Sequence, residues 1–219
     1  EYLDHPVKDC KTWEENVRWR LSPDAPGRIE KARVCAANAK AARDRGEIIV
    51  QQAIGGYMYL RSLMGPSDLL YQFYENPKLI HSCMETWLSL AEAVTTEHQK
   101  EVAFDELFLA EDICYNSGCL ISPDMMHEFL FPYYRRLIEG VRSRNRGRKL
   151  HIQIDTDGRA DDVIDLYREI GMDSLSPFEA AAGCDIVKAS RDYPELLLSG
   201  GIDKRKIVEG GDALRRHLD

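Results

Sequence analysis

The sequence predicts an α/β fold, a (β/α)8 TIM barrel that is incomplete in this chain, with about five parallel strands. Three short apolar strands (Leu150–Asp155, Asp173–Pro177 and Glu195–Ser199) alternate with two helical patterns (Ala160–Ile170 and Asp185–Tyr193). This order implies parallel strands joined by right-handed crossovers. Acidic residues follow the strands at their C-terminal ends, where parallel α/β folds bind ligands. No GxGxxG motif follows a strand, so an open doubly wound sheet is the second choice.

The elements before residue 75 follow from local signals. Prolines interrupt the polar residues 1–28, which favour an extended segment with at most a short helix around Trp13–Trp19. Residues 29–45 are rich in Ala, Lys and Arg and predict a helix. Residues 47–54 predict a strand that ends at two glycines, and two short helices follow, at residues 57–64 and 67–74.

Two long helices and one strand complete the first two thirds of the chain. Asn76-Pro77 places a cap before a proline at the first helical position, and it opens a helix to about Lys100. Residues 106–110 predict a strand. Ser122-Pro123 caps another long helix, which Pro132 should kink or split.

No segment marks a domain boundary, so we predict a single domain over residues 1–219, a partial barrel preceded by the extended residues 1–28. The sequence starts at Glu1 and ends inside a helical pattern, residues 212–218. We therefore interpret the chain as a fragment of a longer protein. Apolar positions on its edge strands should then be exposed.

The strand at residues 150–155 carries polar side chains on one face. Alternation separates an apolar face from a polar one: Leu150, Ile152 and Ile154 against His151, Gln153 and Asp155. In a barrel, the apolar set suits the surrounding helices and the polar set the interior. Residues on one face rise about 6.6 Å per step, so His151 lies about 13 Å below Asp155. We therefore interpret His151 as a hydrogen-bonded core residue rather than a ligand of the same ion.

Composition excludes several classes of partner. The net charge of -8 argues against nucleic acid or an anionic membrane surface. The six cysteines form no CxxC pair and no zinc-finger spacing, which favours a reducing, cytoplasmic location. No apolar run reaches the length of a bilayer span.

Five carboxylates follow strand ends: Asp112, Asp155, Asp157, Glu179 and Asp203. If they converge, they repel one another, and some must bind a proton or a cation. A bound metal, a cationic substrate or partner, or a carboxyl with a raised pKa would each resolve the repulsion. Each residue also has a structural explanation as a helix cap or a loop hydrogen-bond acceptor. Because they share one edge of a parallel sheet, we favour a functional role.

These residues carry a resemblance to a known family. The chain from about Gly55 onward resembles the uroporphyrinogen decarboxylase superfamily, which holds the haem-pathway decarboxylase and the cobalamin-dependent methyltransferases. The most specific matches are Ile121-Ser122-Pro123 with Pro132-Tyr133, the Asp157-Gly158 turn, Pro177-x-Glu179, and Gly200-Gly201-Ile202-Asp203. The resemblance implies a β/α barrel, in agreement with the strand pattern.

The departures from the family motifs affect both known chemistries. In the methyltransferases a strand ends in His-x-Cys-Gly, which supplies two ligands of a thiol-activating zinc; the matching residues here are Asp155 to Gly158, with Asp at both ligand positions. Hard carboxylates thus replace softer ligands. In the decarboxylases Gly-Asn-x-Asp-Pro is usual, and residues 200–204 keep only its first Gly and the Asp. The arginine-rich N-terminal motif of the decarboxylases does not occur in this sequence.

Three hypotheses from different classes follow. The first is corrinoid-linked methyl transfer from a small methylated substrate, the second is uroporphyrinogen decarboxylation, and the third is a non-catalytic barrel that binds a ligand or a corrinoid protein. We favour the first. We assign Asp155, Asp157 and Glu179 as catalytic; Asp112, Gln153 and Asp203 as substrate-binding; and Asp155 and Asp157 as metal ligands.

The cofactors and partners differ among these hypotheses. Methyl transfer implies a divalent metal (Zn, Mg or Mn) and a corrinoid supplied by a partner protein, whereas the decarboxylase needs no cofactor. In each case we expect a small-molecule substrate, with a homodimer left open, and neither nucleic acid nor a membrane as a partner.

Overall fold

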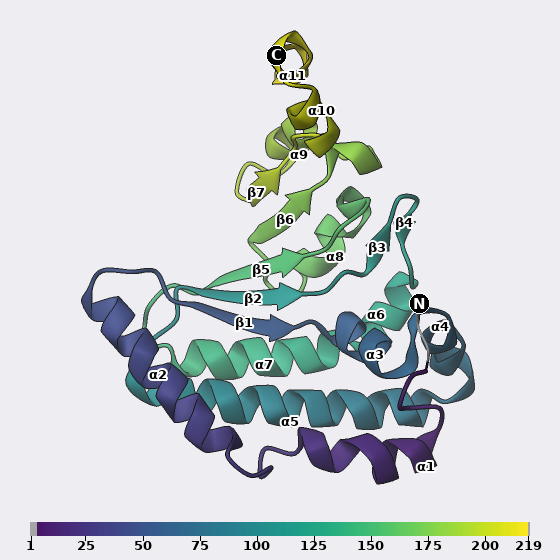
Figure 1. Ribbon diagram of the computed structural model, residues 1–219, viewed down its shortest axis with the longest axis vertical. Helices are drawn as coiled ribbons and strands as arrows, with labels where there is room; N and C mark the ends of the chain where they lie inside the picture. The colour runs from purple at the N-terminus through teal and green to yellow at the C-terminus, as the bar shows by residue number, and fades with distance from the viewer. Residues whose placement is uncertain (1–3, 219) are drawn as a thin grey trace.

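The computed structural model describes residues 4–218 and contains the predicted parallel sheet (Figure 1). Its five strands are β1 (Val50–Ile54), β2 (Glu106–Ala110), β5 (His151–Asp155), β6 (Ser174–Phe178) and β7 (Leu197–Gly200). They are hydrogen-bonded in the order β1-β2-β5-β6-β7, and every neighbouring pair is parallel. Strands that follow one another around a sheet in chain order form a barrel wall, here an incomplete one.

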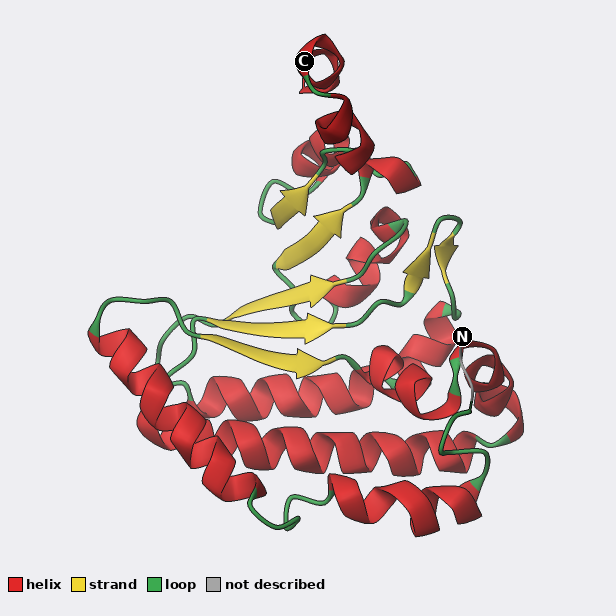
Figure 2. Cartoon of the chain, viewed as in Figure 1, coloured by secondary structure: helices red, strands yellow, loops and turns green. Residues whose placement is uncertain are grey.

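The longest helices cover one face of the sheet. These are α2 (Arg28–Asp44), α5 (Pro77–Glu101) and α7 (Phe131–Arg144), and Figure 2 shows them on the same side of β1, β2 and β5. The shorter helices are α3 (Gly56–Met64), α4 (Pro66–Glu75), α6 (Pro123–Phe129), α8 (Ile164–Arg168), α9 (Ile186–Asp192), α10 (Lys204–Glu209) and α11 (Gly211–Leu218). Within residues 4–218 no helix is both long enough and apolar enough to cross a lipid bilayer.

The N-terminal segment is more helical than the sequence predicted. Helix α1 (Cys10–Thr12) continues through further helical turns to Leu21, whereas we expected an extended chain with a short helix. Asp9 caps this segment by accepting a hydrogen bond from the Thr12 amide at 2.7 Å. Trp13 anchors it, because its ring is buried and its Nε1 donates to Ser82 Oγ at 3.0 Å. The expectation for residues 1–3 lies outside the described residues.

Pro132 splits the long helix as predicted, since α6 ends at Phe129 and α7 starts at Phe131. A small antiparallel hairpin, β3 (Cys114–Tyr115) and β4 (Gly118–Cys119), was not predicted. It has only two residues in each strand, too few for a periodic pattern.

The two faces of the sheet differ in polarity, as the alternation in residues 150–155 predicted. Ile152 and Ile154 are fully buried on the helix side, while His151, Gln153 and Asp155 are half-buried on the other side. His151 Nδ1 lies 2.9 Å from Asp173 Oδ2. Its side chain is 30% exposed, so the prediction of a well-buried core histidine was wrong. Within residues 4–218 no strand pairs with the outer edge of β1 or β7, and apolar residues of both edges are exposed: Val50, Ile54 and Leu197.

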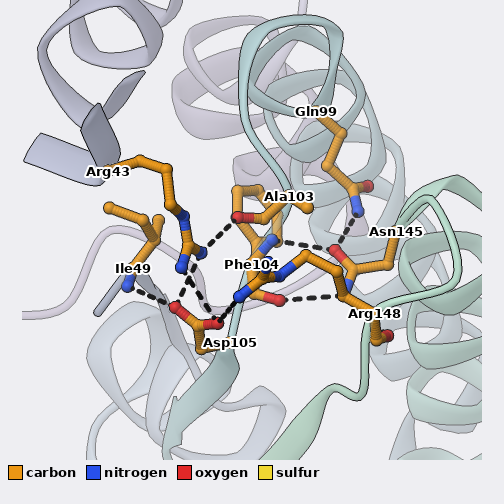
Figure 3. Close-up of polar contacts among 8 residues, drawn as sticks. All are labelled: Arg43, Ile49, Gln99, Ala103, Phe104, Asp105, Asn145 and Arg148. Atoms are coloured by element: carbon orange, nitrogen blue, oxygen red, sulfur yellow. Dashed lines mark hydrogen bonds and ion pairs between the residues drawn. The ribbon is translucent and has the colours of Figure 1, made fainter. Parts of the chain in front are cut away.

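A buried asparagine fixes the start of β2. Asn145 is inaccessible to solvent, and its side chain pairs with both backbone groups of Phe104 (Figure 3). Its Oδ1 accepts from the Phe104 amide and its Nδ2 donates to the Phe104 carbonyl, both at 2.8 Å. Gln99 Nε2 donates to the same Oδ1 at 3.2 Å, and the carbonyl of Arg148 accepts from Nδ2 at 3.2 Å. The side-chain amide of Asn145 therefore makes the two hydrogen bonds with Phe104 that the backbone of a neighbouring strand would otherwise make.

The neighbouring Asp105 joins three segments at the same end of the sheet (Figure 3). Its carboxylate accepts hydrogen bonds from the Ile49 amide at 2.8 Å, from Arg43 at 3.2 Å and from Arg148 at 3.1 Å. Burial alone would raise the pKa of Asp105, but these donors outweigh it and hold the pKa below its ordinary value.

Replacing Asn145 should test this anchor. Asn145→Ala leaves the amide and carbonyl of Phe104 buried without these partners, at a cost of about 1–3 kcal/mol for each group. We expect a loss of about 2–5 kcal/mol in the free energy of unfolding, measured by urea denaturation. Glu139→Ala, at an exposed position of α7, the helix that ends just before Asn145, is the control and should change the stability by less than about 0.5 kcal/mol. Equal effects of both substitutions would contradict the proposed role of Asn145.

Candidate functional site

The candidate site lies at the C-terminal ends of the strands, where β2 and β5 are closely joined. Ala110 and Asp155 are direct partners in the ladder, and so are Asp155 and Ser176. The amides of Glu111 and Asp112 both donate to the carbonyl of Asp155, at 2.8 and 3.2 Å. Asp112 has φ of 45°, a left-handed conformation that Asp tolerates better than most residues. This turn brings the loop after β2 against the loop after β5.

Asp155 and Asp157 lie within electrostatic range of the other predicted carboxylates. Burial raises the pKa of Asp155, and the charges of Asp157 and Asp112 raise it further, against the effect of a hydrogen bond with Ser176 at 3.2 Å. Burial also raises the pKa of Asp157, together with the charges of Glu179 and Asp112, while Lys204 lowers it. The structure thus places these four carboxylates in one group, in which Asp157 is repelled by Asp155, Asp112 and Glu179, and Asp112 also repels Asp155.

Two members of this group already have cationic partners. Asp112 Oδ2 forms an ion pair with Arg61, which extends from α3. Glu179 accepts from the Gly158 amide at 2.8 Å, and its Oε1 lies 3.4 Å from Lys204 Nζ. Glu179 therefore fixes the loop after β5 rather than capping the turn that follows it, which was one of the structural explanations.

Asp203 and Gln153 have well-defined local contacts. Asp203 is 8% exposed, caps α10 through the Arg205 amide at 2.9 Å, and pairs with the Arg205 guanidinium at 2.6 Å. The capping role expected from the sequence is confirmed. Gln153 lies 2.6 Å from Ser176 Oγ, and its amide nitrogen, placed to satisfy both neighbours, donates to Glu106 at 3.0 Å. Substrate binding by Asp203 and Gln153 stays a prediction.

A buried glutamate beneath the site was not assigned a role from the sequence. Glu111 is inaccessible to solvent, and the hydroxyl of Tyr134 lies 2.7 and 2.6 Å from its two oxygens. The amide of Tyr57, in the first turn of α3, donates to Oε1 at 3.2 Å. Burial raises the pKa of Glu111 to about 7. A Cβ added at Gly55 would lie 1.8 Å from Glu111 Oε2, so only glycine fits there.

Arg61 was also missed from the sequence. It comes from a short helix after β1, and the sequence pattern marks it only as one cation among many. The fold places Arg61 in the site. Helix α3 follows β1, β1 pairs with β2, and the helix therefore lies beside Asp112 at the end of β2.

The described residues do not form a complete ligand set at the predicted metal site. Among residues 4–218 no group of three or more His, Cys, Asp or Glu side chains is arranged to hold a metal ion. A tetrahedral zinc site takes three or four protein ligands. Asp155 and Asp157 do not make such a set from the described residues, so their role as metal ligands stays a prediction.

The comparisons with known proteins agree with this architecture. The sequence model of the uroporphyrinogen decarboxylase (URO-D) family matches residues 23–219, so the chain belongs to this family. None of the curated proteins matches the sequence. Among solved structures, a methyltransferase from Methanosarcina mazei is similar in fold, with a TM-score of 0.63 and 15% sequence identity. The similarity covers 89% of this chain and 53% of the methyltransferase, so the chain spans about half the length of that protein.

The pKa of Glu111 predicts how stability depends on pH. The carboxyl has a pKa of about 7 in the folded protein and an ordinary value of 4.5, so the folded state binds more protons between these values. The free energy of unfolding should therefore fall as pH rises from about 4.5 to about 7, by about 3 kcal/mol at most. Glu111→Gln, which carries no charge, should remove this fall.

The control for this prediction is Glu139→Gln, which alters an exposed carboxyl on α7. It should leave the wild-type profile of stability against pH unchanged. Urea denaturation at a series of pH values measures all three proteins. If Glu111→Gln kept the wild-type slope, Glu111 would not be the titrating group.

Metal binding by Asp155 and Asp157 can be tested directly. If the two aspartates are metal ligands, isothermal titration calorimetry with Mg, Mn and Zn gives binding to the wild-type protein that weakens as pH falls, because protonation removes the ligand charge. The Asp155→Asn/Asp157→Asn double variant should bind at least tenfold more weakly. Equal affinity in both proteins, or no binding to either, would remove the metal hypothesis.

Proposed function

We propose that this chain is part of an enzyme that transfers a methyl group from a small methylated substrate to a corrinoid carried by a partner protein. Membership of the URO-D family supports enzymatic activity, and the fold likeness to a methyltransferase is compatible with it. The observation that carries the proposal is the position of Asp155 and Asp157 at the C-terminal edge of the strands, where burial also raises the pKa of both carboxyls. This edge is where barrel enzymes bind their substrates.

The two aspartates suit the proton transfer that methyl removal requires. When a methyl group leaves an oxygen or a nitrogen, the remaining group gains electron density and needs a proton. A carboxyl with a raised pKa keeps its proton at higher pH and can donate it. Asp155 is the better donor because it is half-buried, whereas Asp157 is exposed. The corrinoid, when bound with its partner protein, would supply the acceptor for the methyl group.

The surrounding residues would orient the substrate. Ser176 contacts Asp155 from the inner face of the sheet, and Glu179 holds the Gly158 amide in the loop that carries Asp157.

Decarboxylation of a porphyrinogen is the second candidate, and the Arg61–Asp112 pair favours it. The Arg61 guanidinium can bind a substrate carboxylate through two hydrogen bonds. A protonated Asp155 can then donate to the carbon that loses carbon dioxide. No metal or corrinoid is needed for this reaction.

Two assays separate these candidates. The purified protein is incubated with reduced cobalamin and, one at a time, methanol, methylamines or a methoxylated aromatic, and methylcobalamin is measured by absorbance. In parallel it receives uroporphyrinogen, and carbon dioxide release is measured. Methylcobalamin formation would support the first candidate, carbon dioxide release the second, and neither reaction would favour a barrel that only binds a ligand.

Asp155→Asn should reduce kcat of the supported reaction by about 10²–10⁴-fold, the usual contribution of a general acid. In the wild-type enzyme, activity should fall as pH rises through the pKa of Asp155, because the proton is then lost before the substrate can take it. Asp192→Asn is the matched control: Asp192 is exposed at the end of α9, paired with Lys188. A loss below tenfold in Asp155→Asn, or an equal loss in both variants, would refute this role of Asp155.

A further inference from the structure

Two cysteines face each other across the small hairpin beside the candidate site. Cys114 of β3 is the direct partner of Cys119 of β4. The amide of Leu120 donates to the carbonyl of Ile113 at 3.0 Å, so the next pair along the ladder is hydrogen-bonded. Hydrogen-bonded and non-hydrogen-bonded pairs alternate in an antiparallel ladder. The two cysteines therefore form a non-hydrogen-bonded pair.

This type of pair brings side chains close enough for a covalent bond. In a non-hydrogen-bonded pair the two Cα atoms are about 4.5 Å apart. Disulfides span Cα separations of about 4.4–6.8 Å, so the hairpin lies at the short end of the permitted range. The separation is therefore compatible with a disulfide, and exchange with a thiol can open such a bond again.

The two thiols differ in exposure and in acidity. Cys119 is half-buried, while Cys114 is 6% exposed. The hydrogen bond from the Cys114 thiol lowers the pKa of Cys119, and the same contact together with burial raises the pKa of Cys114. Cys119 Sγ also lies 3.9 Å from Met126 Sδ. Cys119 is thus the thiol that ionises first and that a reagent can reach. Cys114 lies next to it and can act as the second thiol of a disulfide.

We propose that Cys114 and Cys119 form a reversible disulfide by exchange with a low-molecular-weight disulfide of the glutathione class. The Cys119 thiolate attacks one sulfur of the small disulfide, whose S–S bond breaks and releases one thiol. Cys114 then loses its proton and attacks Cys119 Sγ, which releases the second small thiol. Two protein thiols are oxidised, one small disulfide is reduced to two thiols, and the two thiol protons end on the released thiols.

The hairpin is hydrogen-bonded to the loop that follows Asp155 and carries Asp157. Thr156 is buried, and its hydroxyl accepts from the amides of Ile113 and Cys114, both at 3.1 Å. The amide of Arg159 donates to the carbonyl of Tyr115 at 2.9 Å. Closing the disulfide would shift these contacts and alter the site. The formation of the disulfide does not depend on the proposed function; only this effect on activity does.

The test is a titration of the wild-type protein with mixtures of oxidised and reduced glutathione. After acid quenching, peptide mass spectrometry reports the state of each cysteine. We expect the peptide with Cys114 and Cys119 to lose two hydrogens without a glutathione adduct. Cys10 and Cys35 are exposed and serve as matched controls, which should gain glutathione but form no internal disulfide. In Cys114→Ser, a glutathione adduct should persist on Cys119.

Two results would overturn the proposal. One is a stable glutathione adduct on Cys119 of the wild-type protein while Cys114 stays reduced. The other is no reaction of either cysteine at ratios that modify Cys10 and Cys35. Neither result bears on whether the protein transfers methyl groups, so failure here is distinguishable from failure of the proposed function.

Discussion

The buried carboxyl group of Glu111 is the interaction on which the C-terminal edge of the sheet depends. It joins the end of β2 to the first turn of α3 and to Tyr134 of α7. Its pKa of about 7 means that this junction carries a proton for part of the time near neutral pH. Because Asp112 comes next in the chain, the position of the first candidate site residue is set by a group that never contacts solvent.

Some carboxylates at this edge are paired with a cation or a backbone amide and others are not. This difference in partners distinguishes their roles. Asp112 pairs with Arg61, Glu179 with Lys204 and a backbone amide, and Asp203 with Arg205 and the start of α10. Asp155 and Asp157 keep raised pKa values. A group held by a cation or an amide stabilises a loop, whereas a carboxyl with a raised pKa is suited to proton transfer. The same crowding thus produces both structural and candidate catalytic residues.

Most of the fold could be predicted from the sequence, since apolar periodicity and proline positions are local signals. The five strands, the split at Pro132 and the cap at Asp203 were all predicted correctly. The helical turns after Asp9 were underestimated, because burial of Trp13 against α5 stabilises them and no local signal reports that contact. The β3–β4 hairpin was missed because it contains too few residues to show alternation.

By itself, the sequence determined that several carboxylates follow strand ends, and parallel strands bring such ends to one edge. Only the tertiary structure decided which of them have partners, because Arg61 and Lys204 come from distant segments. It also decided that Glu111 is buried, that His151 is partly exposed, and that Cys114 faces Cys119. Burial and charge neutralisation depend on what packs around a side chain in space, and periodicity along the chain carries no information about that.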